Sequence, residues 1–212
     1  MSTAAQPPPD VQDFRHGRVP RAVREEQILS LAEDLFAARG YEGASMDELA
    51  QRAGVSKPMI YSLVGNKEAL FQRCFERSGE ELHARMVAAV AEPHDDLAAE
   101  IRATGQAFYD FIEEHSSAWA MLFSLDTGGR TAASMATIRR RQSDFTAARI
   151  MQYAAAHGSS LDPVRANAAA ALVNSGYETL AHWRRDHPEI ASDQLAEWLV
   201  AFTVPGLEAL LE

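Results

Sequence analysis

Lys57, Pro58 and Met59 have the types and spacing to contact DNA, because they begin a short helix that the sequence predicts and face outward from it. A lysine here can donate hydrogen bonds to guanine O6 and N7 or bind a phosphate, and a methionine can contact a thymine methyl. Ser45 and Ser56 precede two predicted helices, whose first backbone N–H groups can hold a phosphate. This combination favours binding to double-stranded DNA.

Two short helices joined by a tight turn are expected to position these residues. Ser45 and Glu48 have the spacing of a capping box, and Gly54 stands where the first helix needs a left-handed residue to end it. Ser56 is expected to cap the second helix, with Pro58 in its first turn. This pattern is typical of a helix-turn-helix, whose second helix enters the major groove.

The segments on either side complete a small helical domain. Residues 21–39 carry apolar side chains at the spacing of one helical face, and Gly40 is expected to end that helix. Asn66 is expected to cap a helix that runs to about Ala91 and joins this domain to the rest of the chain. Movement of such a helix would reposition the domain.

Residues 1–18 contain three prolines and few large apolar side chains, which predicts a disordered arm. Four arginines lie in this arm or just after it: Arg15, Arg18, Arg21 and Arg24. They either contact the DNA backbone or minor groove, as arms of other proteins do, or belong to a solvated tail.

The rest of the chain predicts an all-helical body without sustained strand alternation or an internal repeat. The expected helices cover about 95–115, 117–125, 131–157, 162–186 and a segment beginning at a cap on Ser192. Pro205 and Gly206 are expected to kink or break this last helix. The predicted fold is therefore all-α, with a disordered arm (1–18), a three-helix DNA-binding domain (19–67) and a helical domain (68–212).

Composition narrows the class of protein. The 212 residues are 47% apolar, as in a globular protein, but no apolar run approaches the ~18 residues of a membrane span. A secretory signal is not expected, and the single cysteine, Cys74, favours a reducing cytoplasm. The net charge is −10, yet residues 14–67 hold eight Lys or Arg against seven Asp or Glu. This asymmetry indicates that the N-terminal domain is the part that meets phosphate.

The run SMDELAQRAGVSKPMIYSLVGNKEALF, preceded by LFAARGYEGA, resembles the N-terminal domain of TetR-type bacterial transcriptional regulators. The resemblance covers about residues 21–75. It implies a homodimer without enzymatic activity, cofactor or membrane association, which binds a palindromic operator in double-stranded DNA and usually represses. It also implies a small-molecule effector that binds in the helical body and releases the DNA.

The resemblance assigns phosphate contacts to Tyr61 and Lys67, which align with the family's recognition-helix tyrosine and the lysine of its fourth helix. The alternative for Tyr61 is an aromatic side chain that only packs in the domain, and the alternative for Lys67 is a solvated surface charge. Many members have Gly-Thr in place of Pro58 and Met59, and Pro-Ser is frequent in place of Gly65 and Asn66. The operator sequence of a relative therefore does not transfer to this chain.

Apolar and aromatic residues of the middle helices, with a few polar ones, are the candidates for the effector pocket. They are Phe108, Phe111, His115, Trp119, Phe123, Phe145, Asn174 and Tyr177. They favour an apolar or aromatic effector, although any one of them can simply be a core residue.

The resemblance places the dimer interface on the last two long helices, where small residues let helices approach closely. The candidates are Ala168, Ala171, Leu172, Ser175, Leu195, Leu199 and Phe202. The alternative is that these faces fill the core of the monomer.

Other constellations keep a second hypothesis open, namely a helical-bundle enzyme or binding protein with an incidental helix-turn-helix-like segment. Glu178 and His182 are one helical turn apart and can ligate a metal, but no third ligand stands at an obvious spacing. The run Arg139 to Arg141 can bind an anionic ligand or stay solvated. No catalytic residue, metal or cofactor is predicted.

Overall fold

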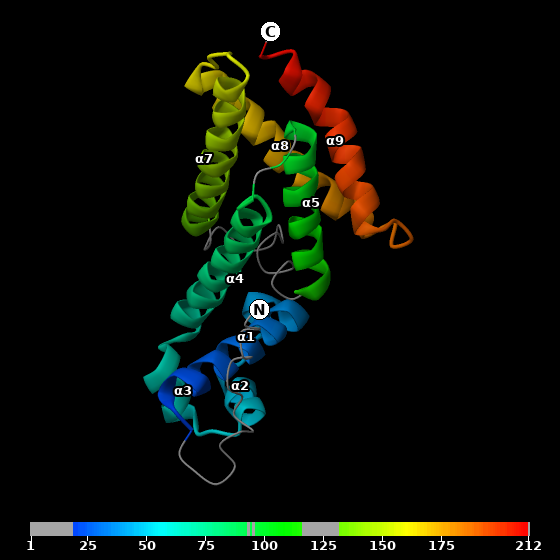
Figure 1. The fold of residues 1–212 in the computed structure, drawn as a ribbon. Coiled ribbons are helices and arrows are strands. Elements are labelled where there is room, and N and C mark those ends of the chain that lie inside the picture. Colours follow the sequence, from blue (N-terminus) through cyan, green and yellow to red (C-terminus); the bar gives the residue numbers. More distant parts are fainter. Residues whose placement is uncertain (1–18, 93, 95, 116–131, 212) are drawn as a thin grey trace, which may run out of the picture. The chain divides into compact units, whose positions relative to one another are not determined.

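The computed structural model describes residues 19–92, 94, 96–115 and 132–211, with the backbone alone for 132–135. These residues form eight α-helices and no strand, which confirms the all-α prediction (Figure 1). Arg15, Arg18, Trp119, Phe123 and the helix expected over 117–125 lie outside the described residues.

The chain divides into two compact units, of which the first ends at Glu76 and the second begins at Arg77. We call them the N-terminal unit and the body. The division falls inside helix α4 (Lys67–Ala89), nine residues beyond the boundary expected after Lys67. None of the described helices is long and apolar enough to cross a membrane.

The N-terminal unit consists of α1 (Arg21–Gly43), α2 (Met46–Ala53), α3 (Lys57–Val64) and the beginning of α4. Its core combines Ile28 of α1, Leu49 of α2, Ile60 of α3 and Leu70 of α4, each almost completely buried. Because every helix contributes to one small core, the three-helix arrangement fixes the direction of α3.

Gly40 interrupts helix α1 where the sequence predicted its end, because its φ of 67° and ψ of 172° are not helical. A short further helical turn follows up to Gly43. This turn brings the ring of Tyr41 against Phe71 of α4, with 5.1 Å between ring centroids, and Phe36 packs on Phe71 at 4.8 Å. The aromatic contacts hold the end of α1 against α4.

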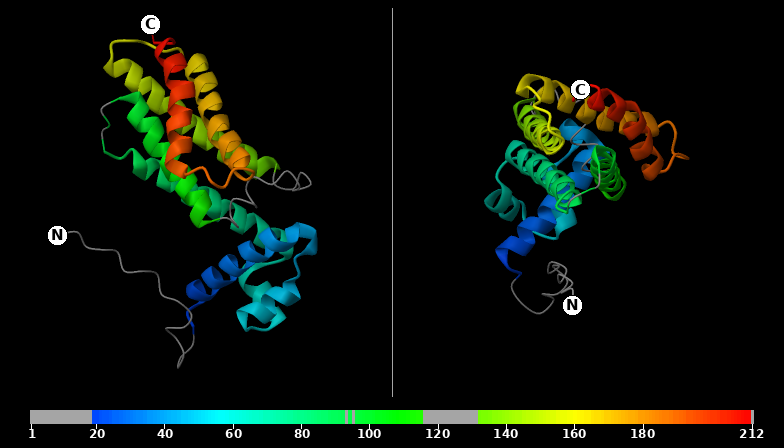
Figure 2. Two further views of the ribbon diagram at one scale, coloured as in Figure 1. Left: turned by 90° about the vertical axis from the view of Figure 1, so that its right-hand side faces the viewer. Right: turned by 45° about the horizontal axis from the view of Figure 1, so that its top comes forward.

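The body consists of the remainder of α4 together with α5 (Leu97–Glu114), α7 (Ala132–Ala156), α8 (Pro163–Arg184) and α9 (Ser192–Glu208). Helix α5 packs along α9, and α7 packs along α8 (Figure 2). Gly105 permits the close approach of α5, since a Cβ there would lie 3.2 Å from Tyr177 and 3.4 Å from the Cβ of Ala196.

Helix α9 differs from the prediction at both ends. Ala191 is its N-cap, and the hydroxyl of Ser192 instead accepts a hydrogen bond from Gln106 of α5. The helix also continues through Pro205. A proline leaves the carbonyl four residues earlier, on Ala201, without its helical partner, but both residues lie on an exposed side where water can replace the N–H.

Candidate functional site

Helix α3 presents one polar face to solvent. Ile60 and Val64 are buried against the N-terminal unit, whereas Lys57, Met59 and Tyr61 are exposed, as are Pro58 and Ser62. Met59 and Tyr61 are large side chains that folded proteins usually bury, yet here they are exposed close to Lys57. This face therefore has the donors and apolar surface that base edges and phosphates require.

The caps of α2 and α3 are simpler than the sequence predicted. The hydroxyl of Ser45 accepts a hydrogen bond from the backbone N–H of Asp47 at 3.2 Å, while Glu48 pairs with Arg52 at 2.5 Å instead of closing a capping box. Ser56 is the N-cap of α3 but makes no side-chain capping bond. Its hydroxyl is thus left for another partner. Gly54 adopts the expected left-handed conformation (φ 66°).

Lys57 is linked to the preceding helix. Its Nζ lies 2.8 Å from a carboxylate oxygen of Asp47, and that hydrogen bond, with the attraction between the charges, raises the pKa of Lys57. Both side chains are exposed, so the pair exchanges with solvent easily. The contact directs the lysine without removing it from the exposed face.

Lys67 is held at the N-terminus of α4. Its Nζ donates a hydrogen bond to the backbone carbonyl of Glu42 at 3.2 Å and lies 4.6 Å from the centroid of the Tyr41 ring. Asn66 caps the same helix by accepting from the N–H of Ala69 at 2.8 Å, as predicted. A cation beside a helix N-terminus is a favourable place for an anion such as phosphate.

Two arginines hold the last turn of α3, a role that the sequence did not reveal. Arg21 donates to the carbonyl of Ser62 at 3.3 Å, and Arg73 donates to the carbonyl of Leu63 at 3.1 Å. Glu25 pairs with both, at 2.6 Å from Arg21 and 3.1 Å from Arg73. Cations at a helix C-terminus satisfy its free carbonyls, so this trio positions α3 on α1 and α4.

Replacing Glu25 by glutamine is expected to destabilise the N-terminal unit by about 0.5–1 kcal/mol at pH 7. Partial burial raises the pKa of Glu25, but hydrogen bonds from Arg21 and Arg73 outweigh it and hold that pKa below its ordinary value. A lowered pKa stabilises the fold above the unfolded pKa, and the stabilisation is lost as the pH falls through the folded value.

Urea unfolding of both proteins at pH 7 and pH 3 measures this effect, and the difference should be smaller at the lower pH. Glu80→Gln, which removes an exposed carboxylate of α4, is the control with little effect at either pH. A difference for Glu25→Gln that is as large at pH 3 as at pH 7 would contradict the charge-based explanation.

The body contains a small cavity of about 30 Å³ among α5, α7 and α8, closed on one side by Val90, which follows the end of α4. Its walls are mainly apolar, and the polar groups on them are already paired. Thr104 and Tyr177 share a hydrogen bond of 2.7 Å, and Arg149 forms a two-pronged ion pair with Glu100. The lining residues are Val90, Leu97, Glu100, Ile101, Thr104, Phe145, Thr146, Arg149, Ile150, Val173 and Tyr177.

Among the predicted pocket residues that the structure describes, Phe145 and Tyr177 line this cavity. Phe108 is buried beside it, with its ring 5.5 Å from that of Tyr177. Asn174 does not line the cavity; it accepts a hydrogen bond from the Thr146 hydroxyl at 3.1 Å. Sequence reasoning missed the paired polar groups, because Glu100 and Arg149 are 49 residues apart and have no local signal.

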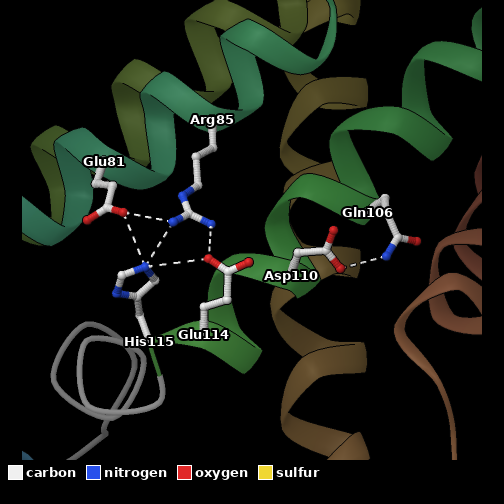
Figure 3. Close-up of polar contacts among 6 residues, drawn as sticks. All are labelled: Glu81, Arg85, Gln106, Asp110, Glu114 and His115. Atoms are coloured by element: carbon white, nitrogen blue, oxygen red, sulfur yellow. Dashed lines mark hydrogen bonds and ion pairs between the residues drawn. The ribbon is translucent and has the colours of Figure 1, made fainter. Parts of the chain in front are cut away.

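His115 belongs to a separate polar cluster between α4 and α5 (Figure 3), and Phe111 packs against it. Arg85 lies 2.7 Å from Glu114, 3.0 Å from Glu81 and 2.9 Å from Nε2 of His115. The buried ring of Phe111 stacks on His115, with 4.9 Å between centroids. This cluster links the two helices, and neither residue lines the cavity.

A stripe of small and apolar side chains is exposed along α8. Val164, Ala168, Ala171, Leu172 and Ser175 are all exposed and recur at helical spacing, with Leu172 74% exposed. Unpaired apolar stripes of this kind mark contact surfaces.

Helix α9 separates the remaining dimer candidates into two kinds. Phe202 is 73% exposed, whereas Leu195 and Leu199 are almost completely buried within the monomer. These two leucines therefore fill the core of the body and have no free surface for a partner.

The structure gives no support to a metal site at Glu178 and His182. Glu178 pairs with Arg139 at 3.0 Å, and the described residues contain no group of three or more acidic, histidine or cysteine side chains suited to a metal. Arg140 and Arg141 are exposed on α7. The described part of the chain therefore adds no group of side chains that supports the helical-bundle enzyme or binding protein.

Two family models match most of the sequence. Residues 28–74 match the model for bacterial regulatory proteins of the tetR family, and residues 97–206 match the tetracyclin repressor-like C-terminal domain. The HTH-type transcriptional activator FasR of Mycolicibacterium smegmatis is 32% identical over 196 residues, which cover 91% of this chain and 87% of FasR.

Solved structures have the same fold. A TetR-like transcriptional regulator from Rhodococcus sp. RHA1 is 30% identical, with a TM-score of 0.73, and the match covers 90% of this chain and 99% of that protein. The fatty acid degradation regulator FadR from Bacillus halodurans has the same TM-score at 15% identity, over 88% and 95% of the two chains. The second match supports the fold alone.

Proposed function

Because this chain belongs to the TetR family of bacterial regulatory proteins and is a transcriptional regulator, we propose that it binds a palindromic operator as a homodimer and releases it when a small molecule occupies the body. The exposed face of α3 is the observation that carries the proposal. Lys57, Met59 and Tyr61 project from a short helix whose opposite face is locked into the core.

In this proposal each N-terminal unit places α3 in a major groove. Lys57 to Met59 read base edges, whereas Tyr61, Lys67 and the N-termini after Ser45 and Ser56 bind phosphates. The support comes from Lys67, which is fixed over the Tyr41 ring beside a capped helix N-terminus. The body carries most of the negative charge of the chain, which leaves the N-terminal unit as the part able to approach DNA.

The proposed dimer forms through the exposed stripe of α8 and the exposed Phe202 of α9. Small residues at Ala168, Ala171 and Ser175 allow the partner's copy of the helix to come close, and Leu172 supplies apolar area. A two-fold axis would bring the same stripe from each subunit together, matching the symmetry of a palindromic operator.

The proposed effector site includes the cavity beside Phe145 and Tyr177. Apolar walls with few polar groups are typical of small-molecule sites. An effector that binds one conformation of the body better than the other shifts the population between them, and α4 continues from the body into the N-terminal unit. This continuity supports α4 as the element that transmits the change.

Lys67→Ala is expected to weaken binding to operator and unrelated DNA alike by about tenfold and to reduce the salt dependence by about one phosphate per subunit. Tyr61→Phe should also weaken both, by a smaller factor, because it removes a single hydroxyl. Gel-shift titrations on DNA upstream of the protein's own gene and of its neighbours, at several salt concentrations, measure these effects and test the proposed function. The absence of sequence-selective binding by the native protein on all of these DNAs would count against it.

Arg140→Ala is the matched control, since it removes an exposed cation of the body. This variant should bind operator DNA and unrelated DNA with affinities within about twofold of those of the native protein. A change of sequence preference on mutating Lys67 would contradict its assignment to phosphate.

Repression is the proposed outcome of operator binding, because a dimer bound across a promoter excludes polymerase without any further contact. Activation is the second candidate, and the name of the similar FasR as an activator favours it. Transcription in vitro from a promoter that contains the mapped operator separates the two. Added protein should lower the transcript level if the proposal holds, and a rise would establish activation.

A further inference from the structure

Asp47 stands beside the residues proposed to read bases, although a carboxylate is an unexpected neighbour for DNA. It lies in the first turn of α2 and its side chain is 67% exposed, whereas Lys57 begins α3 and is 51% exposed. A carboxylate in this place repels phosphates, because both groups are negatively charged. The favourable partner for Asp47 on DNA is therefore a donor on a base and not the backbone.

Asp47 and Lys57 form one donor–acceptor pair on the surface of the N-terminal unit. Nζ of Lys57 lies 2.8 Å from Oδ1 of Asp47. The ammonium of a lysine has three N–H groups, so this contact leaves two that can donate to another molecule. A carboxylate has two oxygens with about four lone-pair positions, so Asp47 can accept a further hydrogen bond while it holds Lys57.

The two side chains start from helices whose separation is fixed. The backbone N–H of Asp47 donates to the hydroxyl of Ser45 at 3.2 Å, and the N-terminus of α2 stabilises the charge of the carboxylate. Ile60 and Val64 lock α3 into the same small core that holds α2. Because the backbones do not need to move, the pair presents its donor and its acceptor side by side at a defined place.

A Watson–Crick base pair offers the complementary arrangement in the major groove. In a G·C pair, guanine O6 accepts and the amino group of cytosine N4 donates. The pairing hydrogen bond joins these two atoms and holds them about 2.9 Å apart. The separation of 2.8 Å between Nζ and Oδ1 matches this distance. Lys57 can thus donate to O6 while Asp47 accepts from the second hydrogen of N4.

The same geometry ranks the four base pairs. A T·A pair with thymine in the place of guanine also offers an acceptor, O4, next to a donor, N6, whereas C·G and A·T pairs present the reverse order. In the reversed pairs Lys57 faces an amino group and Asp47 faces a carbonyl oxygen, so both contacts are repulsive. Guanine further offers N7 to the remaining N–H of Lys57, where thymine carries its methyl group. The expected order is G·C first, then T·A, with C·G and A·T last.

We propose that Asp47 is a specificity-determining residue, which together with Lys57 reads one base pair in each half-site of the operator and prefers G·C. Lys57 contacts the guanine, and Asp47 contacts the cytosine on the opposite strand. Asp47 adds no affinity for DNA in general, since its charge opposes the phosphates. This inference rests on the proposed function, because it specifies part of the operator sequence.

Selection of binding sites from a random DNA pool with the native protein, Lys57→Ala and Asp47→Ala tests this assignment. The native half-site should contain a position where G·C predominates and T·A comes second. Lys57→Ala should lower the preference for G·C over C·G there by about tenfold, and Asp47→Ala by about fivefold at the same position. The affinity of Asp47→Ala for unrelated DNA should stay the same or rise. An Asp47→Ala protein that keeps every base preference, or loses one at a different position from Lys57→Ala, overturns the proposal.

Asp47→Asn separates base reading from the stability of α2. Asparagine keeps the size of the side chain, but its amide can turn either to accept from N4 or to donate to O6. The variant should therefore also lose preference for G·C over C·G, with a Tm close to that of the native protein. A lowered Tm with intact base preferences would show that Asp47 supports the helix only.

Glu48→Gln is the matched control, because it removes a carboxylate from the next position of α2, where Glu48 pairs with Arg52 and not with Lys57. It should leave every base preference unchanged. Relaxation of the same base position by Glu48→Gln would show a general effect of charge and would also overturn the proposal.

The native protein keeps this inference separate from the proposed function. A palindromic site selected by the native protein, with all its preferences retained by Asp47→Ala, defeats this inference alone. Selection of no sequence by the native protein defeats the proposed function as well.

Discussion

Leu172→Glu is expected to convert the proposed homodimer to monomers and to weaken operator binding by about 100-fold or more. Leu172 is 74% exposed in the single chain, so a glutamate there costs the monomer fold little. In a two-fold symmetric interface the substitution introduces two carboxylates into an apolar contact, where each loses its hydration. A monomer can engage only one half of a palindromic operator.

Analytical ultracentrifugation measures the oligomeric state, and gel shifts on the full operator measure the affinity. The matched control is Ala155→Glu, which adds the same charge at an exposed position of α7. It should leave the dimer intact and change operator affinity by less than about threefold. A Leu172→Glu protein that sediments as a dimer would show that the α8 stripe is not the interface.

The N-terminal unit was predictable because its signals are local. Gly54 and Asn66 act within a few residues of their own positions, and both behave as the sequence predicted. One exception is a competing local contact, because Glu48 pairs with Arg52 at i,i+4 spacing instead of closing the capping box. The other involves a distant partner, because Arg73 reaches the end of α3 from another helix, which no short pattern encodes.

The body was predictable as a set of helices but not as a site. Most expected helix ends lie within a few residues of the observed ones. Phe108 and Phe111 are aromatic at helical spacing, yet both are buried outside the cavity lining, because the spacing of one helix does not show which neighbour covers it. The polar lining pairs residues such as Glu100 and Arg149, which meet only in the folded chain.

The two leucines of α9 show the same limit for the dimer surface. Leu195, Leu199 and Phe202 recur at helical spacing and were expected to share an interface. The structure separates them, since both leucines are buried and Phe202 is exposed. Helix α9 packs on α5 and α8 with the face that carries Leu195, Ala196, Leu199, Val204 and Leu207. Phe202 lies just outside the edge of that face, next to Leu195, so its side chain stays exposed.

Leu195→Ala is therefore expected to destabilise the body and not simply to weaken the dimer. Its side chain is 0% exposed in the single chain, and truncating a buried leucine costs about 2–5 kcal/mol through lost burial and the cavity that remains. Thermal unfolding should show a Tm lowered by several degrees, and hydrogen exchange should show lost protection in α5 and α9, which pack together.

Leu172→Ala provides the comparison, since it removes the same atoms from an exposed position of the body. It should change the free energy of unfolding of the monomer by less than about 0.5 kcal/mol, while raising the dissociation constant of the dimer. Both variants are measured over a range of protein concentrations, because dimer dissociation depends on concentration and loss of the monomer core does not. If diluting the native protein abolished the difference between native and Leu195→Ala, the leucine would act at the interface and its burial in the single chain would not determine its role.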